Sequence, residues 1–213
     1  MKEAKKDLPT RLARVLAAKE DDRETRADIA AIAAIDSDDA HRALAQIAAA
    51  AKDAGVQMAA LRKFDARVDK ADATQRKRLR EIALEMCERF PAVDEADRFA
   101  VTFSDFIFSS KRASPRELAV VRRQLAAPAD GLREQTIDLV GILRDRESVP
   151  ALAAMIDDAS EDDLLAIAKT FIAMKLAGAD VKRIASSISH TQREDKREAL
   201  VEKLRAELHG VSR

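Results

Sequence analysis

Apolar residues recur at intervals of three and four along this chain, and that spacing constrains its fold more than any other feature. One such stripe consists of Leu79, Ile82, Ala83, Met86 and Phe90. Strict alternation of apolar and polar residues, which would indicate a half-buried strand, is absent. Five glycines and five prolines among 213 residues also leave little material for the tight turns of a β-rich architecture. The sequence therefore predicts an all-α protein.

Local signals divide the chain into short helices joined by short linkers. Ser114 is followed by Pro115 and Glu117, which is the pattern of a serine N-cap, a proline at the first helical position and a capping-box acid. The segment 160–163 is a close variant of the same box. Gly55 follows a helical stretch, where a left-handed residue often ends the helix. Because short linkers favour antiparallel neighbours, we expect stacked antiparallel helical hairpins.

Residues 132–158 carry a more specific pattern. A helical segment, Leu-Arg-Glu-Gln-Thr-Ile-Asp-Leu-Val-Gly-Ile-Leu, is followed by the turn Arg-Asp-Arg-Glu and then by Ser-Val-Pro-Ala-Leu-Ala-Ala-Met-Ile-Asp-Asp. A helix, a turn, a second helix that opens on Val-Pro-x-Leu and an Asp-rich loop together resemble a HEAT-type repeat of the short bacterial kind. Residues 160–188 resemble a degenerate following unit, and residues 22–51 are weakly similar. Leu164 and Leu165 stand where the family usually has an arginine.

The resemblance implies a HEAT- or armadillo-like solenoid or superhelix, in which hairpins stack because none can bury its apolar face alone. We expect one repeat-like domain over residues 1–213, with a division near Pro91 into residues 1–90 and 92–213 as the alternative. Residues 56–128 match the repeat pattern poorly. The segment 191–209 combines an apolar stripe with a highly charged remainder, which is typical of a C-terminal capping helix.

Charge and cysteine content restrict the classes of function. Lys plus Arg and Asp plus Glu both total 38, and this balance argues against a general polyanion binder. The single cysteine, Cys87, excludes an internal disulfide framework and suits a reducing compartment. The longest apolar run, residues 29–35, falls far below the roughly 20 residues that span a bilayer. We expect a cytoplasmic protein without a membrane partner.

Residue types that carry catalysis are scattered along the chain. The three histidines, His41, His190 and His209, have no further ligand at metal spacing. His41 lies near the start of a helix, where a phosphorylatable histidine could stand, but we expect a surface histidine. Cys87 has no visible basic partner and is expected in the core. Gly-rich phosphate loops and hydrolase motifs are absent from the sequence. We therefore expect no enzyme and no catalytic, cofactor-binding or metal-binding residue.

Two features indicate a candidate interaction surface. The first is a basic cluster that comprises Arg76, Lys77, Arg78 and Arg80. It could contact phosphates, or it could be a solvated helix face offset by acids just downstream, and no aromatic residue interleaves with it for base stacking. The second is Phe108, which is displaced from the face shared by Phe99, Phe103 and Phe106. A helix that is apolar on two faces is either central in its bundle or presents one face to a partner.

Three functions remain open at this point. The leading hypothesis is a non-catalytic protein–protein interaction module, a scaffold or adaptor that binds a protein partner or another copy of itself along a helical face. The first alternative is a nucleic-acid-binding helical protein that uses the cluster between Arg76 and Arg80. The second alternative is a small helical-bundle signalling regulator, which would be compact where a stacked solenoid would be elongated.

Overall fold

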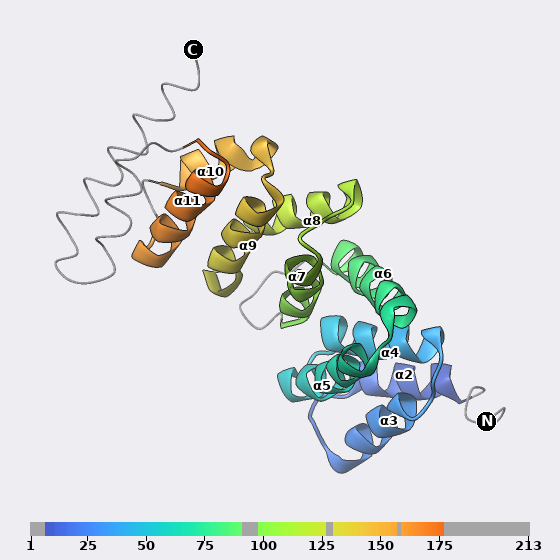
Figure 1. Cartoon of the computed structure of the whole chain (residues 1–213). Coiled ribbons are helices and arrows are strands. Elements are labelled where there is room, and N and C mark those ends of the chain that lie inside the picture. Colours follow the sequence, from blue (N-terminus) through green and yellow to red (C-terminus); the bar gives the residue numbers. More distant parts are fainter. Residues whose placement is uncertain (1–6, 91–97, 127–129, 157–158, 177–213) are drawn as a thin grey trace. The chain divides into compact units, whose positions relative to one another are not determined.

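The computed structural model of the chain describes residues 7–90, 98–126, 130–156 and 159–176 (Figure 1). These residues form ten α-helices and one short 3-10 helix, and no strand occurs among them. The all-α prediction is therefore confirmed for this part of the chain. The chain divides into two compact units, Met1–Phe106 and Ile107–Arg213. The prediction of one repeat-like domain, and its alternative of a division near Pro91, stay predictions.

The first unit is built from five helices and the start of a sixth. They are α2 (Leu8–Ala17), α3 (Arg23–Ala33), α4 (Asp38–Ala50), α5 (Ala54–Lys70), α6 (Ala73–Arg89) and α7 (Arg98–Ser110). The second unit receives the end of α7 and continues with α8 (Pro115–Leu125), α9 (Asp130–Leu143), η1 (Arg146–Ser148), α10 (Val149–Met155) and α11 (Glu161–Ala173).

Side-chain caps explain where many of these helices begin. An N-cap side chain accepts a hydrogen bond from a backbone N–H of the first turn, which would otherwise have no partner in the helix. The capping residues are Asp22, Ser37, Asp53, Asp72, Ser114 and Ser160. The complete capping box at Ser114 and the cap at Ser160 confirm the corresponding sequence predictions. Asp72 and Gln75 form a further box that fixes the start of α6.

Helix α4 is the centre of the first unit. It packs against α2, α3, α5 and α6, and Leu44 and Ile47 are completely buried. Four of its alanines are buried as well, and their small side chains let neighbouring helices approach closely. The predicted apolar face of α6 is buried at Leu79, Ile82, Ala83 and Met86, whereas Phe90 at its end is partly exposed.

The core of the second unit lies between α9 and α11. Ile137 and Val140 of α9 and Ile167 and Phe171 of α11 are fully buried. Thr170 of α11 lies directly against Gly141 of α9, and its hydroxyl donates a hydrogen bond of 2.9 Å to the carbonyl oxygen of Ile137. The tight contact therefore depends on a missing side chain at Gly141.

An ion pair joins α8 to the turn after α9. The Arg122 guanidinium donates to both carboxylate oxygens of Asp145, at 2.7 and 2.5 Å, and Ser148 donates to the same carboxylate at 2.7 Å. The side chain of Asp145 is 5% exposed, so this carboxylate is buried with its charge compensated. Arg122 holds the pKa of the Asp145 carboxyl below its usual value of 3.8.

The prediction for Gly55 is wrong. Gly55 lies in the first turn of α5, because Asp53 caps the helix just before it and accepts a hydrogen bond from the N–H of Val56. A Cβ at Gly55 would lie 2.9 Å from the Cβ of Asp21, so close approach is what requires glycine here. In the described chain, left-handed backbone occurs instead at Lys111, Arg144 and Lys175.

Several other sequence predictions concern residues outside the described chain. They are the predicted capping helix 191–209, residues 177–188 of the predicted unit 160–188, and the histidines His190 and His209. None of the described helices is long and apolar enough to cross a membrane.

Candidate interaction site

The four residues of the basic cluster lie in the first half of α6. Arg76, Lys77 and Arg78 are exposed, whereas Arg80 is partly buried. The first three side chains make no hydrogen bond or ion pair with the rest of the described chain, and Arg80 does have a partner. Glu85, one of the acids expected to offset the cluster, pairs with Arg42 of α4 at 3.2 Å. Three positive charges on α6 are thus left to solvent or to a partner.

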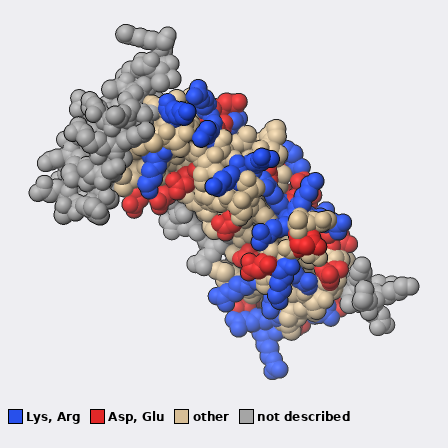
Figure 2. Space-filling model, in the orientation of Figure 1, with Lys and Arg blue, Asp and Glu red and all other residues tan. Residues whose placement is uncertain are grey.

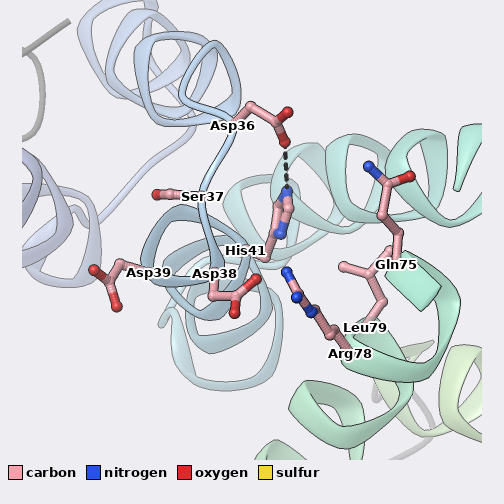
Figure 3. A pocket seen from close by; sticks show the side chains of 8 residues that line it. All are labelled: Asp36, Ser37, Asp38, Asp39, His41, Gln75, Arg78 and Leu79. Atoms are coloured by element: carbon pink, nitrogen blue, oxygen red, sulfur yellow. Dashed lines mark ion pairs between the residues drawn. The ribbon is translucent and has the colours of Figure 1, made fainter.

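A pocket of about 310 Å³ lies beside this cluster, between the start of α4 and the first half of α6 (Figure 3). Its walls are formed by Asp36, Ser37, Asp38, Asp39 and His41 on one side and by Gln75, Arg78 and Leu79 on the other. All of these residues belong to the first unit. Arg78 is therefore both a member of the basic cluster and a wall of the pocket.

Local sequence places the acidic wall. The Ser37 hydroxyl caps α4 by accepting the N–H of Ala40 at 3.3 Å, so Asp38 and Asp39 fall in the first turn of the helix. Carboxylates are favourable there because the unpaired N–H groups of a helix N-terminus carry partial positive charge. On the other wall, Leu79 is buried and Arg78, its neighbour in sequence, is left at the surface.

His41 lines the pocket with a ring that is largely enclosed. Its side chain is 13% exposed, and its Nε2 is buried without a hydrogen-bond partner, 3.7 Å from the Asp36 carboxylate. Asp36 also faces the guanidinium of Arg67 on α5 at 3.5 Å. Burial and then Arg67 lower the pKa of His41, against the opposing charges of Asp36 and Asp38. Burial and the Arg67 charge thus both favour the neutral imidazole.

The expectation of a surface histidine at position 41 is only partly met, because His41 lines a surface pocket but its ring nitrogen Nε2 is buried. His41 follows two exposed aspartates in the sequence, and nothing local marks it as buried. It is covered because α4 packs against both α5 and α6, which are separate in sequence from its own segment.

Unpaired charges of opposite sign face this one pocket. Asp38 makes no hydrogen bond or ion pair through its carboxylate within the described chain, and the same holds for the Arg78 guanidinium. Figure 3 shows Arg78 reaching from α6 towards the α4 side of the pocket, where the carboxylate of Asp38 also lies. Asp39 has a distant partner in Arg42, at 3.9 Å. A polar ligand with charges of both signs would therefore find partners on both walls.

Phe108 does not join this site. It lies near the end of α7, is partly buried, and belongs to the second unit, whereas the pocket belongs to the first. Phe103 and Phe106 on the same helix are buried, which confirms the prediction that they form core. The side chain of Phe99 lies outside the described part. In the described chain, Ile142 is the one large apolar side chain classed as exposed, at 38%.

Other candidates for chemistry contribute little to the site. Cys87 is 4% exposed on the buried face of α6, as predicted for a core residue. Within the described ranges, no group of three or more His, Cys, Asp and Glu side chains could hold a metal ion. The arrangement at the pocket is suited to recognising charged groups through hydrogen bonds and ion pairs.

The acidic wall was missed from the sequence. The run Asp36-Ser37-Asp38-Asp39 is a visible signal, since it combines an N-cap with three carboxylates. What the sequence does not display is that α4 and α6 pack together and bring this run opposite Arg78.

Known proteins provide no further guide to the site. A scan against models of protein families gave no match, and searches of curated proteins and of solved structures found no similar chain.

Proposed function

We propose that this chain is a non-catalytic protein-interaction module, a scaffold or adaptor made of HEAT-like helical hairpins. It binds a protein partner by shape and charge complementarity on its helical surface. The observation that carries the proposal is the pocket between α4 and α6, where Asp38 and Arg78 stand unpaired beside the exposed Arg76 and Lys77. Interfaces commonly use such charges for specificity and for steering the encounter.

The contact between α9 and α11 in the second unit supports the stacking of helices in this proposal. Helix α9 is followed by a short turn and by α10, and α11 then packs against α9. Contact between the leading helices of successive hairpins is what a helical repeat needs to bury its apolar faces. The predicted first helix and second helix of this segment correspond to α9 and α10, and the predicted Asp-rich loop at 157–158 lies outside the described residues.

The side chains around His41 support a binding role over a catalytic one. Nε2, the ring nitrogen with no hydrogen-bond partner, is enclosed, so it has no open path to a reactant. The hydroxyl nearest in sequence, that of Ser37, is engaged as the cap of α4.

Nucleic-acid binding is the second candidate, because Arg76, Lys77 and Arg78 form three consecutive exposed cations. Phosphate contacts could use all three. Asp36, Asp38 and Asp39 lie close by, however, and would repel a polyanion. Figure 2 also shows acidic and basic side chains interspersed on the face in view instead of gathered into one basic stripe. A protein surface of mixed charge is the better fit.

A charge-reversal experiment tests the proposal. The three cations Arg76, Lys77 and Arg78 are changed together to glutamate, and each protein is used to capture partners after chemical cross-linking. A matched control changes Arg62, Lys63 and Lys70 of α5 to glutamate, since these cations are also exposed and make no ion pair within the described chain. We expect a partner protein that is captured by the wild type and the control but lost from the α6 variant. Equal capture by all three proteins would contradict the proposal.

A mobility-shift assay at low salt separates the nucleic-acid alternative. A shift of DNA or RNA that disappears in the α6 variant would indicate that the partner is a nucleic acid and not a protein. The logarithm of the binding constant should then fall linearly with the logarithm of the salt concentration.

A further inference from the structure

Some charged side chains of the pocket between α4 and α6 form ion pairs within the chain, and others form none. Asp36 is held by Arg67 at 3.5 Å and Asp39 by Arg42 at 3.9 Å. On the other wall, Gln75 is committed to the capping box, because its side-chain oxygen accepts the N–H of Asp72 at 3.1 Å. Asp38 and Arg78 are the charged lining residues that remain without a hydrogen bond or ion pair in the described chain.

The two unengaged groups have opposite signs and do not pair with each other. No ion pair within 4.0 Å joins them, although both line the same pocket (Figure 3). The pocket that both residues line measures about 310 Å³, which is room for side chains of a partner. A ligand that carries one charge of each sign can therefore satisfy both groups at once.

Ligands of a single sign fit less well. An acidic segment at Arg78 would also meet the carboxylates of Asp36, Asp38 and Asp39. A basic segment at Asp38 would also meet the guanidinium of Arg78. The guanidinium of an arginine can hold a carboxylate through two parallel hydrogen bonds, and a carboxylate can accept several from an ammonium or guanidinium group.

We propose that this pocket recognises a mixed-charge peptide segment of the partner protein, whose lysine or arginine reaches Asp38 while its glutamate or aspartate reaches Arg78. This inference rests on the proposed function and adds the chemical class of the partner's binding segment.

Short fluorescent peptides provide the probe. One peptide contains lysine and glutamate near each other, a second replaces each lysine by glutamate, and a third replaces each glutamate by lysine. Binding to the full chain is followed by fluorescence anisotropy at low ionic strength. We expect the mixed peptide to bind most tightly.

Two single variants and their combination then test the two contacts. Arg78→Glu and Asp38→Lys should each weaken the mixed peptide about fivefold or more, because each replaces an exposed ion pair by a repulsion of similar size. The double variant Asp38→Lys/Arg78→Glu should recover binding, since it exchanges the two charges between the walls. Both residues are exposed, so circular dichroism should show unchanged helix content. The α5 variant described above should bind the mixed peptide like the wild type.

Several results would overturn the inference. One is an all-glutamate peptide that binds as tightly as the mixed one, which would indicate an acidic partner. Another is a single-stranded oligonucleotide that binds more tightly after Asp38→Lys, which would indicate a nucleic acid. If none of the three peptides binds while the α6 variant still loses its captured partner, the inference fails and the proposed function stands. If the captured partner also survives charge reversal on α6, both fail.

Discussion

Gly141→Ala tests the contact of Gly141 on α9 with Thr170 on α11. A Cβ at position 141 would lie 2.7 Å from Oγ1 of Thr170 and 3.2 Å from the Cα of the same residue. Rotation of the threonine side chain could relieve the first contact but not the second, because the second involves backbone. Helix α11 must therefore shift by a few tenths of an ångström away from α9. The hydrogen bond from Thr170 to the carbonyl of Ile137 would be strained or lost.

Three effects decide the size of the change. Alanine is favoured over glycine inside a helix by about 1 kcal/mol. Overpacking a buried contact costs about 1–3 kcal/mol, and the loss of the Thr170 hydrogen bond costs about 1 kcal/mol more. The unfavourable effects win, and we expect the free energy of unfolding to fall by about 1–3 kcal/mol.

Urea unfolding followed by circular dichroism measures this loss. Ile142→Ala is the matched control, because Ile142 is the next residue on α9 and its side chain is exposed. The double variant Gly141→Ala/Thr170→Ala should regain part of the loss, since it removes the Oγ1 that the new methyl group would meet. A Gly141→Ala protein as stable as the wild type, or more stable, would refute the reasoning, because helix propensity alone would then decide the outcome.

Three further predictions concern single side chains. Asp145→Ala should reduce the free energy of unfolding by about 2–3 kcal/mol in urea, because Arg122 and Ser148 lose a buried acceptor; a change below 0.5 kcal/mol, the range of ordinary surface substitutions, would contradict this. Ser114→Ala should reduce the free energy of unfolding by about 1 kcal/mol in the same assay, since the capping box of α8 is lost. Ser114→Thr should retain most of the stability that the cap provides, because threonine can also accept the hydrogen bond. The pKa of His41 is lowered from 6.5, so the unfolded chain binds this proton more readily. Its contribution to stability is complete above pH 6.5 and is lost as the pH falls through the folded-state pKa; His41→Gln should remove that component, and an NMR titration showing a pKa above 6.5 would be inconsistent with the burial.

The described helices and several of their ends could be predicted from the sequence. The stripe of α6 and the cap at Ser114 are both encoded within a few residues, because a helix brings positions three and four apart to one face. The burial of Cys87 follows from the same periodicity. Exposure of Lys77 was predictable for the complementary reason: it lies on the opposite side of α6 from the apolar stripe.

The role of a single small or polar residue was harder to predict. Gly141 shares the apolar face of α9, and only its contact with Thr170 on α11 shows that a side chain would not fit. Gly55 resembles a helix end in the sequence, but Asp53 begins a helix there and Asp21 approaches from a different segment. In both cases the deciding neighbour is distant in sequence, so no local pattern records it.

The spacing of apolar residues by three and four along the sequence determined that the described chain is helical. It also determined which faces of those helices are apolar. Periodicity and caps act through neighbours within one or two turns, and the sequence displays those neighbours directly. The tertiary structure alone decided that His41 is covered and that Asp38 and Arg78 line one pocket. Those facts depend on how α4, α5 and α6 pack, which brings together side chains that no spacing along the chain relates.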